Sequence, residues 1–169
     1  MVAGIQLAYH IYIPVQQSCY SVEQKTVRGY SMEPRLYENN TIQVLMKYYD
    51  CHDVKRGDVV LAEYPGHPDG LIVKNVKAIP NDTLSFANDT DGWHIVVNGI
   101  TLTNSKGIPY VFSESRIQLL KSYDTAGLGI IQSPWYLLMG EVPEGSSDSS
   151  RYGLFSKDMI VGKVVMTQS

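Results

Sequence analysis

The segment LIVKNVKAI, residues 71–79, combines Leu, Ile, Val and Ala with two lysines and one asparagine. A short run of β-branched residues bounded by turn residues predicts a β-strand. Because side chains alternate between the two faces of a strand, Lys74 shares a face with Ile72 and Val76, and Lys77 points to the opposite face. Burial disfavours the charged form of a lysine, so the pKa of Lys74 falls and its amine can act as a base. The alternative is a surface lysine whose stem lies along apolar neighbours.

Further runs rich in Val, Ile and Tyr predict strands over residues 43–49, 58–64, 93–98, 136–139 and 160–166. Residues 113–121 (SESRIQLLK) predict a short helix for which Ser113 can serve as the N-cap. We therefore expect a mostly β domain of coiled antiparallel sheets, with residues 84–134 as a long inserted segment that contains this one helix. The expected division is an N-terminal segment over 1–24 and the folded domain over 25–169.

The composition excludes several classes of protein. The chain has 169 residues, enough for one domain with a sizeable core. Hydrophobic residues make up 44% of the chain, which excludes a disordered protein. The net charge of −3 provides no basic surface for nucleic acid, so no nucleic-acid partner is expected.

Cysteine and histidine side chains can form a disulfide or a metal site. Cys19 and Cys51 can form one bridge, but the sequence leaves the pairing open. Cys51-His52 resembles one corner of a metal site, whereas the other three histidines show no ligand spacing. Since tetrahedral zinc needs three or four convergent ligands, we expect neither a metal nor another cofactor.

Residues 2–15 (VAGIQLAYHIYIPV) form an apolar stretch near the N-terminus. They are too few for a transmembrane helix, which needs about 20 apolar residues, and they lack the basic n-region of a signal peptide. Three interpretations stay open. The stretch is an ordinary strand that joins the fold, an amphipathic edge, or the last turn of a trimmed membrane anchor.

The segment GYSMEP, residues 29–34, is a candidate nucleophile site. Gly29 leaves room for a substrate backbone, and Pro34 fixes the chain after Ser31. The chain has no GxSxG elbow, and no histidine is flanked as a Ser-His-Asp set would require. The base for Ser31 is therefore sought in a lysine, and Lys74 is the candidate.

Four blocks together resemble the type I signal peptidases and their conjugation-linked, pilin-maturing relatives, which use a Ser-Lys dyad. Residues 27–36 (VRGYSMEPRL) resemble the nucleophile box G-x-S-M-x-P-T-L, and residues 55–60 (KRGDVV) resemble the strand box (K/R)-G-D-(I/V)-V. Residues 72–82 (IVKNVKAIPND) resemble the base box I-K-R-V-x-G-x-P-G-D. Met139-Gly140 with residues 146–153 (SSDSSRYG) resembles G-D-N-R…S-x-D-S-R-x-x-G. The resemblance implies the fold of the signal-peptidase and SOS-repressor peptidases.

The resemblance also implies the roles of the central residues. Ser31 Oγ would attack the scissile carbonyl, and Lys74 Nζ would accept its proton. The Ser31 N–H would be one oxyanion donor. Some family members add a hydroxyl at the position of Gly29, so a second donor here must come from the backbone or from water.

Supporting and substrate-binding residues follow from the same resemblance. Ser146 would orient the base, while Asp148 and Arg151 would form an ion pair beside the dyad. The alternative for that pair is a solvated surface contact worth under about 1 kcal/mol. The residues expected to contact substrate are Tyr30, Met32, Pro34 and Ile72.

The sequence departs from the family pattern at several positions. Arg35 stands where the family has Thr, Asn75 replaces Arg, and Asn81 replaces Gly. The G-D-N-R element reads GEVP over 140–143, and the arginine after Asp-Ser comes one position late. These departures leave both dyad residues in place and predict a divergent member.

The implied activity is that of a serine endopeptidase that cleaves after small residues in an extended signal peptide or pilin-like preprotein. The free edges expected to bind the peptide are strand 71–76 and the segment before Ser31. Family members normally carry N-terminal transmembrane helices, so we expect a trimmed anchor or peripheral docking. The expected location is the extracytoplasmic face of a bacterial plasma membrane, with the mitochondrial inner membrane as the alternative.

Two other functions compete with this one. A self-cleaving SOS-repressor-type regulator shares the nucleophile box and the dyad, and Ala3-Gly4 resembles its cleavage site. Against it, only 30 residues precede Ser31, too few for a DNA-binding domain. The second competitor is a catalytically silent scaffold for pilus assembly, which the presence of both Ser31 and Lys74 disfavours.

Overall fold

The computed structural model describes residues 19–64, 66, 70–123, 129–142 and 145–165. The strands and helices of the described part, in chain order, are β1 (Ser21–Thr26), β2 (Thr41–Met46), the 3-10 helix η1 (Tyr48–Asp50), β3 (Val59–Glu63), β4 (Leu71–Ala78), β5 (Leu84–Asn88), β6 (Trp93–Val97), β7 (Ile100–Thr101), α1 (Glu114–Lys121), β8 (Trp135–Met139), α2 (Ser149–Tyr152), β9 (Phe155–Ser156), the 3-10 helix η2 (Lys157–Met159) and β10 (Ile160–Val165).

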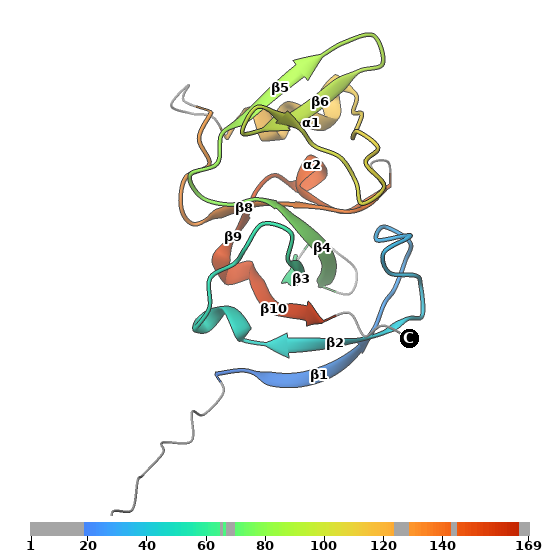
Figure 1. The fold of residues 1–169 in the computed structure, drawn as a ribbon, viewed down its shortest axis with the longest axis vertical. Coiled ribbons are helices and arrows are strands. Elements are labelled where there is room, and N and C mark those ends of the chain that lie inside the picture. Colours follow the sequence, from blue (N-terminus) through green and yellow to red (C-terminus); the bar gives the residue numbers. More distant parts are fainter. Residues whose placement is uncertain (1–18, 65, 67–69, 124–128, 143–144, 166–169) are drawn as a thin grey trace, which may run out of the picture.

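The described strands form two antiparallel sheets. The larger has the order β1-β2-β10-β3-β4-β8-β9 and the smaller the order β5-β6-β7. Figure 1 shows β1, β2, β10, β3 and β4 in the lower part of the molecule, with β5, β6 and α1 at the opposite end. The predicted mostly β, antiparallel fold is confirmed.

The strand predicted over 43–49 is wrong in its second half. β2 ends at Met46, and Lys47 takes a left-handed conformation with φ of 62°. That conformation cannot continue a strand, so the chain turns into η1, where Tyr49 is buried. The predicted helix is present as α1, but the Ser113 hydroxyl faces Ser115 Oγ at 3.1 Å and makes no bond to the helix backbone.

β1 was not predicted, and it crosses the expected boundary after residue 24. Its whole length pairs with β2, from Ser21 opposite Met46 to Thr26 opposite Thr41. The expected anchor remnant over 2–15 lies outside the described residues. Within the described ranges, no helix is long and apolar enough to cross a membrane.

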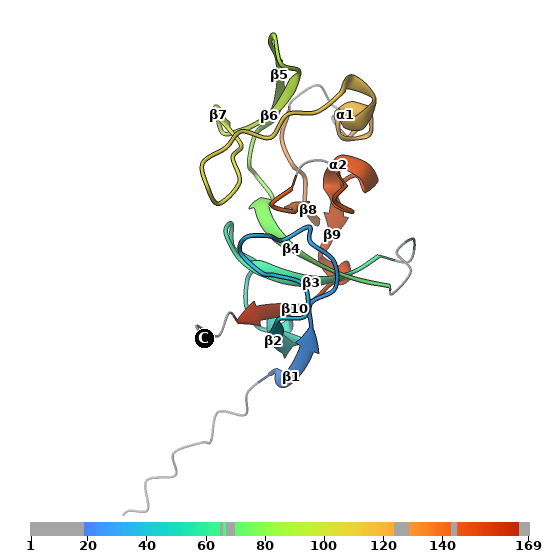
Figure 2. The same cartoon turned by 90° about the vertical axis from the view of Figure 1, so that its right-hand side faces the viewer.

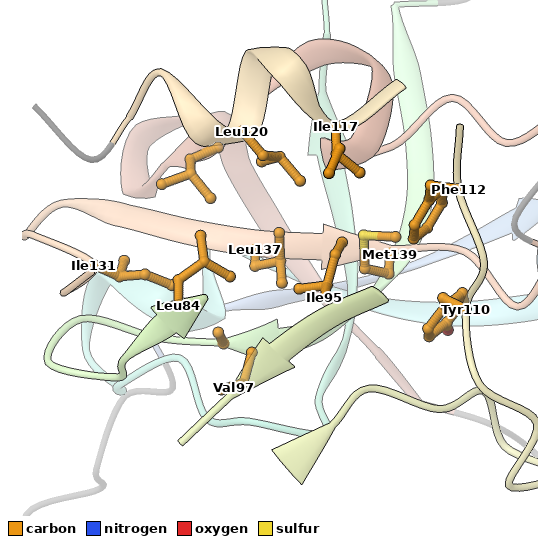
Figure 3. Packing of buried hydrophobic residues seen from close by; sticks show 12 residues of the cluster. Leu84, Ile95, Val97, Tyr110, Phe112, Ile117, Leu120, Ile131, Leu137 and Met139 are labelled. Carbon is orange, nitrogen blue, oxygen red and sulfur yellow. The ribbon is translucent and has the colours of Figure 1, made fainter. Parts of the chain in front are cut away.

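The segment predicted as an insertion, 84–134, packs around a core that it shares with Ala78, β8 and Leu154. Figure 3 shows Ile117 and Leu120 of α1 pointing towards Leu137 of β8, with Leu84 and Ile95 on the other side. Figure 2 shows α1 above α2, beside the β5–β6 hairpin. Burying this apolar surface fixes α1 and the loop before it against β8, the strand that leads to the last family block.

The cysteine pairing that the sequence left open is resolved. Cys19 and Cys51 form a disulfide that joins the residues before β1 to the end of η1. Both cysteines are exposed. The bridge ties the edge strand of the larger sheet to the body of the protein.

Candidate active site

A cavity of about 450 Å³ lies between the end of β1, the loop after it and the first half of β4. It is lined by residues 24–32, residues 71–74, Ile42, Leu61, Gly145 and Ser147. Ser31 and Lys74 are both in this lining, although 43 positions separate them in the chain. The fold therefore brings the two predicted dyad residues together in one hollow.

The loop that carries Ser31 is held by hydrogen bonds on both sides. Glu33 N–H donates to the Tyr30 carbonyl at 3.0 Å, which closes a turn around Ser31. The Ser31 carbonyl accepts from Glu141 N–H at 2.7 Å. Met32 is 2% exposed and anchors the loop in the core of the larger sheet. These contacts fix the backbone from which the Ser31 hydroxyl projects.

Lys74 is the second member of the pair. Its side chain lies in β4 and is 3% exposed, and Nζ donates to Ser31 Oγ at 2.7 Å and to the Val73 carbonyl at 2.8 Å. Burial lowers the pKa of Lys74 to about 8, although the negative charge of Asp148 opposes this shift. A substantial fraction of the amine is then neutral near pH 8, as a general base requires.

The backbone N–H groups of Ser31 and Gly29 differ in whether they are available to an oxyanion. Within the described residues the Ser31 N–H has no hydrogen-bond acceptor, so it is available to a ligand in the cavity. The Gly29 N–H instead donates to a Glu38 carboxylate oxygen at 3.2 Å. Gly29 has a φ of 76°, a conformation that a residue with a Cβ adopts rarely, so glycine at this position allows the loop to turn towards Ser31.

The predicted ion pair between Asp148 and Arg151 is wrong. Asp148 caps α2 and accepts hydrogen bonds from Ser150 N and Ser150 Oγ, and its other oxygen accepts from Gly140 N at 3.0 Å. Its carboxylate is thus occupied by local donors. Arg151 is exposed and has no ion pair among the described residues.

Ser146 lies beside the dyad but makes no hydrogen bond that would orient the base. Its Oγ is fully buried, and no described residue provides a hydrogen-bond partner. Gly140 packs directly against this hydroxyl and against the Ser31 carbonyl. The missing Cβ at Gly140 therefore allows Ser146 and Ser31 to approach each other.

Three of the four predicted substrate-contacting residues line the cavity, namely Tyr30, Met32 and Ile72. Pro34 does not, because the chain turns away after Met32 and Leu36 N–H donates back to the Met32 carbonyl. Met32 is largely a core residue. The sequence did not predict Gly145 and Ser147 as residues of the cavity wall. Neither occupies a defined position of the family motifs, so nothing in the sequence distinguished them from residues of a surface loop.

Two further residues from the inserted segment support the site and were also missed. Arg116 of α1 donates to the Ser146 carbonyl at 2.8 Å and to Ser150 Oγ at 3.0 Å. Tyr110 donates its hydroxyl proton to the Gly140 carbonyl at 2.6 Å, and burial raises the pKa of Tyr110, which keeps that proton in place. No sequence signal connects these positions to the dyad, because only tertiary packing brings them there.

The first half of β4 offers a free edge to a peptide. β4 pairs with β3 along residues 71–75, whereas β8 pairs with it only from Asn75 onwards. On the second side, residues 71–74 face the cavity and no described strand covers them. The expected edge of 71–76 is thus shorter than predicted.

Among the described residues, two groups of side chains have the composition of a metal site. One is Cys19, Cys51 and His52, but both cysteines belong to the disulfide, so their thiolates are not available. The other group is Asp89, Asp91 and His94 at the β5–β6 hairpin. His94 Nε2 lies 3.0 Å from Asp91 and 3.2 Å from Asp89, which is the geometry of a protonated histidine paired with carboxylates.

This histidine predicts a pH-dependent contribution to stability. The hydrogen bond to Asp91, followed by that to Asp89, raises the pKa of His94 against the opposing effect of burial. Because the pKa of His94 is raised in the folded state, the stabilisation from its charged form is complete below the unfolded-state pKa of about 6.5. This stabilisation is lost as pH rises through the folded-state pKa. We expect the difference in unfolding free energy between the protein and His94→Gln to shrink as pH rises, by up to about 1 kcal/mol. Urea unfolding from pH 5.5 to 9 measures it, and a difference independent of pH would contradict this assignment.

Comparison with known proteins identifies the family. A family model described as signal peptidase, peptidase S26, matches residues 4–168. The chain is 29% identical over 154 residues to signal peptidase IB of Staphylococcus aureus (strain COL), covering 86% of this chain and 76% of that protein. It is 30% identical over 140 residues to signal peptidase I of Bacillus amyloliquefaciens, covering 80% of this chain and 70% of that protein.

Among solved structures, a signal peptidase I from Enterococcus faecalis V583 superposes with a TM-score of 0.46 at 20% identity, covering 68% of this chain and 98% of that one. The family assignment does not depend on this superposition, because the family model spans nearly the whole chain. The chain belongs to the signal peptidase family, peptidase S26, and is a serine peptidase of the signal peptidase I type.

Proposed function

We propose that this chain is an endopeptidase that removes signal peptides, or matures a pilin-like preprotein, after small residues, with Ser31 as nucleophile and Lys74 as general base. The observation that carries the proposal is the 2.7 Å contact between Lys74 Nζ and Ser31 Oγ, made by a lysine that is 3% exposed. A surface lysine would stay charged at neutral pH, whereas this one is shifted towards the neutral form.

The chemistry follows from these two groups. Neutral Lys74 accepts the Ser31 proton as Oγ attacks the scissile carbonyl, and the resulting oxyanion accepts a hydrogen bond from the Ser31 N–H. The Lys74 ammonium then gives its proton to the leaving amine, and the C–N bond breaks to leave an ester on Ser31. Lys74 next accepts a proton from water, which attacks the ester, and the proton returns to Ser31 Oγ as the carboxylic product leaves.

The substrate binds as an extended strand along the free edge of residues 71–74, between that edge and the loop before Ser31. Ile72 and Met32 give the hollow apolar walls. Signal peptides end in small residues of the A-x-A type, whose methyl groups such walls can accept.

The location proposed for this chain is the extracytoplasmic face of a bacterial plasma membrane. The relatives that support it are the signal peptidases of Staphylococcus aureus and Bacillus amyloliquefaciens, both bacterial. Signal-peptide substrates are delivered across a membrane, so the peptidase has to work at that surface.

A peptide panel in detergent tests the proposal. Peptides with Ala at one and three positions before the scissile bond should be cleaved, and Phe at either position should slow cleavage at least about 10-fold. Ser31→Ala is the control that assigns the cleavage to this chain. Cleavage that persists in Ser31→Ala, or that ignores side-chain size, would reject the proposal, and no cleavage of any peptide or preprotein would favour a silent scaffold.

A further inference from the structure

A hydrogen-bonded chain of three side chains lies behind the dyad. Arg35 Nη1 donates to Asn75 Oδ1 at 2.7 Å, and Asn75 Nδ2 donates to Glu141 Oε1 at 2.8 Å. The backbone N–H of Glu141 donates in turn to the Ser31 carbonyl at 2.7 Å. The chain of contacts therefore runs from a guanidinium to the nucleophile's own peptide group.

The three side chains come from the three segments that build the site. Arg35 is four positions after Ser31, Asn75 follows Lys74 on β4, and Glu141 follows the buried Gly140. A displacement of any one of them is transmitted to the backbone of a segment that carries or contacts the dyad. None of the three is within the lining of the cavity, so none is placed to touch substrate.

Burial makes this network sensitive to the loss of one member. Asn75 and Glu141 are each 1% exposed. A buried carboxylate is costly unless hydrogen bonds and a nearby cation compensate it. Glu141 receives Asn75 Nδ2 on one oxygen and Ser105 N–H, at 2.7 Å, on the other, but it has no direct ion pair among the described residues.

Asn75 is suited to link the two charges because an amide both accepts and donates. Its oxygen accepts from Arg35, and its nitrogen donates to Glu141. An arginine at this position can only donate, so it would bind Glu141 but repel Arg35. The residue at 75 therefore depends on the residue at 35.

These three positions are also three of the departures from the family pattern, which has Thr, Arg and Asp where this chain has Arg35, Asn75 and Glu141. We propose that Arg35, Asn75 and Glu141 form one interdependent positioning unit that holds the Ser31 peptide group for attack. The Arg35 guanidinium donates to the Asn75 amide, and the amide in turn donates to the buried Glu141 carboxylate. This inference rests on the proposed function only for its kinetic consequences.

A double-mutant cycle tests the unit, using Asn75→Arg, Arg35→Thr and the two combined. We expect each single variant to lower kcat with KM nearly unchanged, and the combination to recover much of the loss. The expected coupling is between about 2-fold and 150-fold in kcat, the span for residues that share one network. Lys157→Thr, which removes one exposed positive charge outside the network, is the matched control. Combined with Asn75→Arg, it should give no recovery of kcat.

Hydrogen exchange of the Glu141 amide provides a second measurement that does not need activity. This N–H makes the bond to the Ser31 carbonyl, so its exchange should accelerate in each single variant and slow again in the combination. If Asn75→Arg fails to fold, the kcat and the Glu141 amide exchange of Arg35→Thr and Arg35→Lys test the positioning unit. The lysine can still donate to Asn75 and should restore part of both kcat and amide protection.

Several results would overturn the inference. If the effects of Asn75→Arg and Arg35→Thr on kcat are additive, the inference is overturned. It is also overturned if Lys157→Thr recovers as much kcat as Arg35→Thr does in the Asn75→Arg protein. A fall in melting temperature without any change in kcat or in Glu141 exchange would make the three residues merely structural. If the unaltered protein cleaves no peptide, the proposed function fails, and the exchange data still decide whether the unit holds Ser31.

Discussion

Lys74→Ala should lower kcat/KM for a cleaved peptide by about 10³-fold, within the range that a general base contributes. The amine that contacts Ser31 Oγ at 2.7 Å is then absent, and no other described residue makes a hydrogen bond to this hydroxyl. Ser31→Ala should remove at least as much activity. Because the two groups act in one step, the double variant should be no worse than Ser31→Ala alone.

The pH profile separates a base from a mere positive charge. Burial lowers the pKa of Lys74 to about 8, so kcat/KM should rise with pH and level off above about 8. Lys74→Arg keeps the charge but cannot lose its proton, and it should be inactive at every pH.

Lys157→Ala is the control for Lys74→Ala. Lys157 is exposed and lies outside the cavity lining. It should keep kcat/KM within a few-fold. Activity in Lys74→Arg, or a flat profile between pH 6 and 9, would remove Lys74 from the role of base.

Sequence patterns predicted the sheet and the pairing of Lys74 with apolar neighbours because both depend on a local period. The alternation along 71–79 placed Lys74 on the face of Ile72 and Val76, and the structure buries all three. β1 escaped prediction since its sequence, SVEQKT, has one large apolar residue, and its stability comes from pairing with β2 and from the disulfide. Such support is visible only in three dimensions.

The error over Asp148 and Arg151 has a related cause. The ion pair was implied by the family resemblance, but the first turn of α2 needs acceptors for its unpaired N–H groups, and the Asp148 side chain accepts from Ser150 N. A cap satisfies those donors at short range, whereas an exposed ion pair contributes little. The roles assigned to Ser31, Lys74 and Ser146 stay predictions until the variants are measured.

Gly140 marks the place where two segments of the site come closest, and it carries the second large prediction. A Cβ added there would lie too close to Ser146 Oγ and 2.7 Å from the Ser31 carbonyl oxygen. Neither neighbour can withdraw freely. The Ser31 carbonyl is held by Glu141 N–H, and Ser146 is fully buried.

Gly140→Ala should therefore move the Ser31 loop and lower kcat by about 10²-fold, the cost of a displacement near 1 Å at a reacting group. Unfolding free energy should fall by about 1–3 kcal/mol, as for other overpacked cores. Gly162→Ala is the control, because its Cβ would lie 2.7 Å from Val44 Cγ1 and 3.0 Å from the Leu45 carbonyl oxygen, between β10 and β2. It should cost similar stability in urea unfolding yet leave kcat per folded molecule unchanged. Equal kcat in the two variants would mean that the contact of Gly140 with Ser31 has no part in positioning the nucleophile.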